Sequence, residues 1–195
     1  MLKMTKINLD LISDIDMQLF IGKGMRGGIS YIAHRYAKAN NKYMSGYNPG
    51  EENSYLMYSD ANNLYGWAMS QPLPTGDFQW TDPEEIEFFN YHEYSDEGVI
   101  LEVDLEYPEE LHNLHNDCPC APEKMCITDD MLSDYCSETK NQHKISSGTV
   151  PKIITSLKDK TKYVLHCQNL KLYLDLGLKV KNKYTELKNF HKVNG

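Results

Sequence analysis

The chain has 195 residues, of which 41% are hydrophobic and 25% are charged, as in ordinary globular proteins. It contains no apolar run of about eighteen residues that would cross a membrane and no signal-peptide core, so an intracellular protein is the default expectation. The five cysteines are an odd number, which argues against a disulfide framework.

The formal net charge of −8 is unevenly distributed along the chain. Residues 1–49 carry seven Lys or Arg and three Asp, and residues 151–195 carry ten Lys and three acids. Between them, residues 51–150 carry three Lys and 22 acids. Two basic flanks around an acidic middle are compatible with nucleic acid bound at the flanks, although solvated surface charge explains the same pattern.

The first fifty residues predict one helix and one long loop. Ser13 or Asp14 can cap a helix that ends near Ile21, because several glycines follow. Residues 29–39 are expected to be extended at first and helical later. Residues 40–50 are expected to form a loop.

The next part of the chain predicts two strands and a helix. Residues 54–59 are aromatic and apolar, which indicates a buried strand. Residues 64–69 are expected to be helical until the Pro-Leu-Pro-Thr-Gly run at 72–76 stops the helix. The acidic run 82–87 is expected to be a solvated loop. Residues 98–107 alternate between apolar and charged side chains, which predicts a half-buried strand.

The second half predicts an irregular segment, a hairpin and a helix. Residues 109–148 are acidic and rich in Cys, His and Pro, and only one short helix near 129–135 is expected there. Residues 149–155 and 162–166 form a plausible β-hairpin. Residues 167–177 predict a helix that ends at its final glycine. Strands with helices between them indicate an α+β fold.

Asp60 is the candidate metal ligand. It follows the predicted strand 54–59 and precedes a turn, so its carboxylate would lie at a sheet edge, and hard divalent cations prefer such oxygen ligands. Tyr65 lies at the start of the predicted helix, whose N-terminal N–H groups suit phosphate oxygens. The alternative is purely structural, because Asp-x-Asn-Asn is also a common turn and helix-cap composition.

Several segments resemble protein-primed, family B DNA polymerases of the organellar and viral type. Asp60-Ala-Asn-Asn-Leu-Tyr65 is similar to motif A of that family, and residues 66–76 resemble its continuation in protein-primed members. Met25-Arg-Gly-Gly28 resembles the Tyr-x-Gly-Gly motif that joins the exonuclease and polymerase domains. Residues 26–42 and 150–179 are similar to polymerases of large self-synthesising transposons, the Polinton/Maverick group.

The resemblance covers about residues 5–182 and implies template-directed addition of deoxynucleotides to a primer by a two-metal mechanism. It implies that Asp60 is the catalytic carboxylate and that Asp60 and the carbonyl of Ala61 bind Mg²⁺, with two ions in the complete enzyme. The residues implied to bind the nucleotide are Asn62, Asn63, Leu64 and Tyr65.

The resemblance also implies a DNA-binding site and three partners. Arg26, Gly27 and Gly28 would contact the template, since a bare glycine backbone can approach a phosphate closely. The implied partners are a DNA primer-template, a dNTP and, in the complete enzyme, a terminal priming protein. The resemblance implies no membrane partner. The location is unknown but intracellular, and the nucleus is possible for a polymerase derived from a transposon.

The implied fold is an incomplete polymerase palm with antiparallel strands and flanking helices, plus a partial segment that resembles the terminal-protein region. Residues 1–22 would be the end of an exonuclease-side region or a linker, and residues 23–110 the palm part with motif A. Residues 111–148 would form an acidic connector that contains Cys and His. Residues 149–195 would form a truncated, basic hairpin-helix segment.

The chain departs from the family in ways that bear on catalysis. The family motif begins with Tyr where this chain has Met25, and no Asp-Thr-Asp motif or fingers lysine is found after Lys179. One carboxylate cannot organise two metal ions, so the chain alone is expected to be inactive, as a fragment or a transposon relic. The competing hypothesis is a non-enzymatic protein that binds nucleic acid or another partner.

A zinc site is conceivable between residues 112 and 143, where four cysteines and three histidines gather. Zinc is not expected there, because the segment lacks the paired Cys-x2-Cys spacing of zinc knuckles. The lysine-rich segment 152–192 is either a solvated surface or a contact for DNA and the priming protein.

Overall fold

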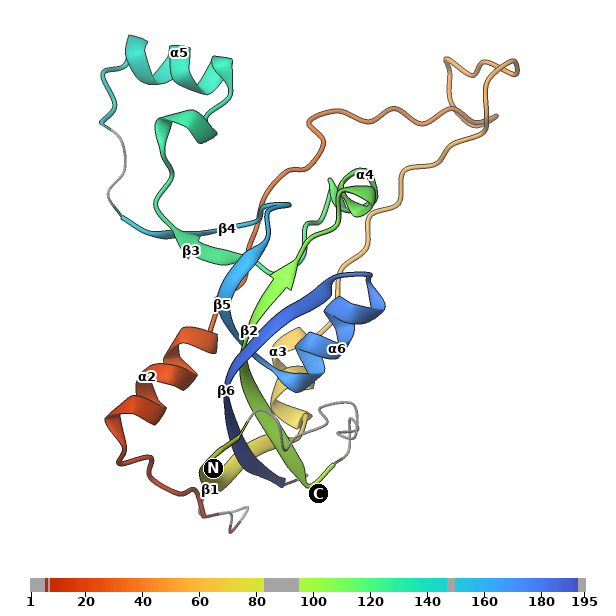
Figure 1. Cartoon of the computed structure of the whole chain (residues 1–195). Coiled ribbons are helices and arrows are strands. Elements are labelled where there is room, and N and C mark those ends of the chain that lie inside the picture. Colours follow the sequence, from red (N-terminus) through yellow and green to blue (C-terminus); the bar gives the residue numbers. More distant parts are fainter. Residues whose placement is uncertain (1–5, 7, 83–94, 147–149, 193–195) are drawn as a thin grey trace.

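The computed structural model describes residues 6, 8–82, 95–146 and 150–192, which form two antiparallel sheets and several helices (Figure 1). The main sheet has the strand order β1-β6-β2-β5, and a small sheet pairs β3 with β4. The strands are β1 (Leu73–Thr81), β2 (Glu97–Glu106), β3 (Glu123–Met125), β4 (Lys152–Ile154), β5 (Lys160–His166) and β6 (Lys179–Lys192).

The helices and strands together confirm the expected α+β class. The α-helices of the described residues are α2 (Ile15–Gly24), α3 (Leu64–Ser70), α4 (His112–His115), α5 (Asp134–Gln142) and α6 (Cys167–Asp175). The 3-10 helices are η2 (Glu109–Leu111) and η3 (Asp129–Met131). The main sheet joins strands from residues 73–106 with strands from residues 160–192, so distant parts of the chain share one sheet.

β2 is a central strand of the main sheet and is buried on both faces. It pairs with β5 through Leu101 and Leu165, and with β6 through Ile100 and Leu187. The strand predicted at 98–107 is confirmed, but seven of its ten residues are buried, so its expected half-burial is wrong. The reason is that helices cover both faces of the sheet, which a single strand's alternation cannot indicate.

One face of the sheet packs against α6. Val99, Leu101, Val103 and Leu105 are fully buried on this face, where they share a core with Leu170 and other side chains of the α6 region. Burying a Leu or Val side chain contributes about 1.5–3 kcal/mol, so this cluster is the main apolar core.

The ends of α6 agree with the prediction for residues 167–177. The helix stops at Asp175, and Gly177 follows with a φ of +98°, a left-handed conformation that glycine adopts without strain. The N–H of Leu178 donates to the carbonyl of Tyr173 at 3.0 Å, which satisfies a helix-terminal carbonyl.

The other face of the sheet packs against α2 (Figure 1). Phe20 of the helix is buried with Ile100, Val164 and Leu187 of three different strands. The carboxylate of Asp14 caps the helix by accepting from the N–H groups of its first turn, as the sequence predicts. The helix runs to Gly24 rather than ending near residue 21.

Residues 29–63 form a long arm that leaves the sheet and returns to it (Figure 1). The strand predicted at 54–59 is wrong: Met57 and Tyr58 are 88% and 95% exposed, and the described backbone of the arm pairs as a bridge only between Asn40 and Ser54. The helix predicted within residues 29–39 is also wrong. A strand needs a partner strand, and no element of the described structure lies beside residues 55–58 to supply one.

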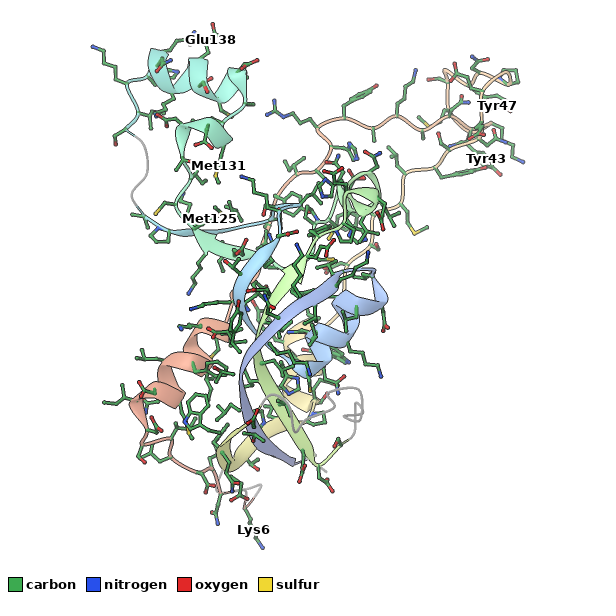
Figure 2. The ribbon with its side chains drawn as sticks, in the orientation of Figure 1. Lys6, Tyr43, Tyr47, Met125, Met131 and Glu138 are labelled. Atoms are coloured by element: carbon green, nitrogen blue, oxygen red, sulfur yellow. The ribbon has the colours of Figure 1, made fainter. Side chains whose placement is uncertain are left out.

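Turns and side-chain hydrogen bonds hold the tip of the arm, which confirms the loop predicted at residues 40–50. The Asn40 amide donates to the carbonyls of Asn48 and Glu52 at 3.0 and 3.1 Å. Figure 2 shows Tyr43 and Tyr47 at this tip, away from the main sheet.

The hairpin predicted from residues 149–155 and 162–166 is wrong. β4 pairs with β3, and β5 pairs with β2, because β5 carries apolar residues that complete the main core. The short helix expected near 129–135 is split in the structure between η3 and the start of α5. The described part of the segment 109–148 also contains η2, α4 and β3. Figure 2 shows Met125 and Glu138 on a small unit that projects away from the main sheet.

The helix predicted at 64–69 is confirmed as α3, and it stops before Pro72 as expected. The proline-containing run then begins β1, which the sequence did not predict. The acidic run 82–87 lies outside the described residues apart from Asp82. β6 was not predicted either, since its charged side chains do not show the apolar alternation of a strand.

Asp104 is a buried carboxylate within β2. It accepts hydrogen bonds from the Asn182 amide at 2.9 Å, from the Tyr184 hydroxyl, and from the Lys162 N–H at 2.8 Å. These donors hold the pKa of the Asp104 carboxyl below its usual range. The ionised carboxylate therefore ties β2 to both β5 and β6.

The lowered pKa predicts how the stability of the chain changes with pH. The Asp104 contribution is fully present above the unfolded pKa of about 3.9 and is lost as the pH falls through the lower, folded pKa. Asp104→Asn should therefore lower the Tm at pH 7, and the difference from the wild type should shrink below about pH 4. Thermal unfolding followed by circular dichroism measures this, with the exposed Asp60→Asn as control. A Tm difference that stays constant across this pH range would contradict the assignment.

Candidate metal and nucleic-acid site

Asp60 lies on an exposed part of the arm, directly before α3. Asn62 and Asn63 form the turn between them, and Asn63 has a left-handed conformation with φ 51° and ψ 43°. The carboxylate of Asp60 and the carbonyl of Ala61 are therefore on a solvent-facing turn rather than at the edge of a buried strand. The turn itself is as the sequence predicts, whereas the strand before it is absent.

The nucleotide-binding candidates continue into the first turn of α3. Tyr65 is 87% exposed and Leu64 is 55% exposed, and no residue of α3 is buried. A Cβ at position 66 would lie 2.3 Å from the side-chain amide nitrogen of Asn63, so a residue other than Gly66 would displace the Asn63 side chain. Residues 60–65 thus form one continuous, open surface with a carboxylate at one end and a phenol ring at the other.

The described residues contain no group of three or more His, Cys, Asp or Glu side chains that could hold a metal ion. Asp60 is accordingly not joined there by the further carboxylates that a two-metal centre requires. What Asp60 offers is one carboxylate ligand on an exposed turn.

The predicted DNA contact Arg26 follows the C-terminal end of α2 and lies against β5. Its Nη1 donates to the carbonyls of Gly24 and Val164 at 3.1 and 2.7 Å, and its guanidinium lies 3.8 Å from the centroid of the Tyr163 ring. Burial raises the pKa of the Tyr163 hydroxyl, which keeps this ring neutral. Arg26 is therefore held in place by the sheet.

Gly27 and Gly28 continue from Arg26 along an open surface. A Cβ at Gly28 would have no atom within 4 Å, and one at Gly27 would only touch Ile153 at 3.9 Å. A phosphate could therefore approach the backbone of Gly27 and Gly28 closely.

The structure brings three further basic residues close to Arg26. Lys23, Lys124 and Lys162 line the same open pocket as Arg26, and they come from three different segments of the chain. None of the three was named individually from the sequence, although Lys162 lies in the lysine-rich segment 152–192, which was a candidate DNA contact. Lys23 stands three residues before Arg26. Lys124 had no local signal, and only the folded structure brings it to the pocket.

The Cys and His segment is organised around Tyr107. The hydroxyl of Tyr107 lies 2.7 Å from Nδ1 of the buried His115 and accepts from the N–H of Cys120 at 3.1 Å. Burial raises the pKa of Tyr107 to about 12 and also raises the pKa of the Cys120 thiol. These contacts close the segment onto the end of β2, which is a structural role.

Comparisons of the chain with protein-family models, with curated proteins and with solved structures find no match. Within the part of the chain that the structure describes, no helix combines the length and the apolar character needed to cross a membrane.

The contacts of Arg26 predict that it contributes to stability, unlike Asp60. Arg26→Met keeps an apolar stem but removes the hydrogen bonds to the carbonyls of Gly24 and Val164, so the free energy of unfolding should fall by about 1–3 kcal/mol. Asp60→Asn changes an exposed carboxylate and should alter it by less than about 0.5 kcal/mol. Urea denaturation measures both values. An Arg26→Met protein as stable as the wild type would refute these contacts.

Proposed function

We propose that this chain is a DNA-binding palm segment of a protein-primed, family B-like DNA polymerase. Asp60 would be one of the carboxylates that bind catalytic Mg²⁺, and Tyr65 would lie beneath the incoming deoxynucleotide. Arg26, Gly27 and Gly28 would contact the template strand. The chain alone would bind DNA without extending a primer.

The observation that carries the proposal is the run Asp60-Ala-Asn-Asn-Leu-Tyr65, which resembles motif A and is exposed along its whole length. An exposed carboxylate and an exposed ring, joined by an exposed turn, are accessible to a metal-bound triphosphate. The alternative role of Asp60 as a helix cap has less support, since the N-cap residue of α3 is Asn63 and no side-chain hydrogen bond caps the helix.

Arg26 gives the proposal a second, separate support. Its hydrogen bonds in the described structure go to carbonyl oxygens, and a carboxylate is not among them, so its charge remains available to an anion. The adjacent glycines leave the backbone open. A fixed cation beside bare backbone suits the positioning of a nucleic-acid strand by its phosphates.

Catalysis by this chain alone is not part of the proposal. Two-metal phosphoryl transfer needs metal ions held by several ligands, and Asp60 is the one candidate carboxylate of the exposed turn. The same fact favours the second candidate function, a nucleic-acid-binding protein without catalysis. A measurement of metal binding at Asp60 distinguishes the polymerase segment from the non-catalytic nucleic-acid-binding protein.

Mn²⁺ is a paramagnetic substitute for Mg²⁺ that reports which residues lie near the ion. With Mn²⁺ and a dNTP, the NMR signals of the Ala61, Asn62 and Asn63 amides should broaden, because the ion binds at the Asp60 carboxylate. The broadening should disappear in Asp60→Asn. Equal broadening in the two proteins, or none in the wild type, would remove the metal role of Asp60.

Primer extension tests the catalytic part directly. The purified chain, supplied with Mg²⁺, dNTPs and a primed template, should yield no elongated product, because a single carboxylate leaves the metal pair incomplete. Denaturing electrophoresis of a labelled primer detects any product. Elongation that Asp60→Asn abolishes would show that the chain contains a complete active site.

A further inference from the structure

An open pocket of about 260 Å³ lies where the C-terminal end of α2 meets β3 and β5. Four basic side chains line it: Lys23 and Arg26 from the α2 end, Lys124 from β3 and Lys162 from β5. Figure 1 shows these three elements converging on one side of the main sheet. The pocket is locally basic in a chain whose net charge is −8.

The one carboxylate that lines the pocket among the described residues is already neutralised. Oε2 of Glu123 lies 2.9 Å from Nζ of Lys160, whose side chain is completely buried. Lys160 also donates to the carbonyl and hydroxyl oxygens of Ser156 at 3.1 and 2.7 Å. Glu123 is thus held by the protein's own buried cation, so it opposes the charge of the pocket only weakly.

Arg26 still has hydrogen-bond donors for a ligand. Its described hydrogen bonds both come from Nη1, and a guanidinium has further N–H groups on Nη2 and Nε. The Val164 carbonyl and the Tyr163 ring fix its plane. A fixed guanidinium recognises a phosphate at a lower entropic cost than a mobile one.

Lys124 and Lys162 are exposed at the rim of the pocket and are less committed to the fold than Arg26. The ammonium of Lys162 lies 5.8 Å from the centroid of the Tyr184 ring, and its own N–H is held by Asp104. The backbone of Lys162 is therefore fixed. Its side chain is exposed, and its positive charge also acts on the nearby Asp104 carboxylate. Lys23 is less suited to bind a ligand. Its Nζ lies 3.8 Å from Oε1 of Glu102, and it also stands at the negative end of the α2 dipole.

We propose that this pocket binds a phosphate group of a single-stranded DNA backbone through Arg26, Lys124 and Lys162. Phosphate is favoured over a carboxylate ligand because cations from three segments of the chain surround one small space. The inference rests on the proposed function for the source of the phosphate. The existence of the phosphate site does not depend on Asp60 or on metal.

The test compares two double variants with equal changes in charge. Lys124→Gln with Lys162→Gln removes two cations from the pocket, and Lys171→Gln with Lys179→Gln removes two exposed cations at α6 and the start of β6. Lys23 and Arg26 stay in place because both also support the fold. Binding of a fluorescent oligothymidylate is followed by anisotropy in EDTA, from about 50 to 200 mM salt.

The pocket variant should bind the oligothymidylate about tenfold more weakly at low salt, and its log–log salt slope should be shallower by about 0.7, the value for the one phosphate that the pocket binds. The control pair should keep the wild-type slope. Equal effects of the two pairs would overturn the proposal, because they would show that only net charge matters.

A second measurement identifies the source of the phosphate. Inorganic phosphate, titrated against chloride at matched ionic strength, should shift the amide NMR signals of Thr161 and Lys162 in the wild type and not in the pocket variant. Such shifts without any effect on DNA binding would assign the pocket to free phosphate and overturn the DNA source. If neither DNA nor phosphate responds to the pocket, the proposal fails, whatever metal does at Asp60.

Discussion

The burial of β2 on both faces is the constraint on which the rest of the structure depends. A strand with β5 on one edge, β6 on the other, and α6 and α2 on opposite faces must place most of its side chains in contact with protein. On the face toward α6, the strand buries Val99, Leu101, Val103 and Leu105, and on the face toward α2 it buries Ile100. Asp104 is tolerated because donors from both neighbouring strands surround it, and an unpaired buried carboxylate would be costly.

This constraint also positions the basic pocket. Because β5 must pair with β2, its outer edge faces the small sheet, and Lys162 and Lys124 meet there. Because α2 must cover Ile100 and Val164, its last turn ends at the same place, next to Arg26. Cations from distant parts of the sequence are thus gathered by apolar packing, while the acidic middle of the chain supplies β2 and the segment that closes onto Tyr107. The basic flanks and the acidic middle therefore belong to one folded unit.

Short sequence signals correctly predicted helix boundaries that depend only on neighbouring residues. The Asp14 cap and Gly177 mark the ends of α2 and α6 correctly, because capping depends on a few neighbouring residues. Strand partners could not be predicted, since pairing depends on contacts across the whole fold, and the hairpin and the strand 54–59 were therefore wrong. The same holds for the candidate site: Arg26 was selected from a motif, whereas Lys124 is about 98 positions away and joins it only in the folded structure, where the adjacent Glu123 contacts Lys160 of β5.

The charges proposed to bind DNA lie on the α2 side of the β2-centred sheet. Hydrogen–deuterium exchange with mass spectrometry, with and without single-stranded DNA, tests this directly on the unmodified chain. Bound DNA should slow exchange in peptides covering residues 22–28 and 121–126, and should leave α6 at residues 167–175 unchanged. Protection confined to α6, or no protection anywhere at saturating DNA, would contradict the account.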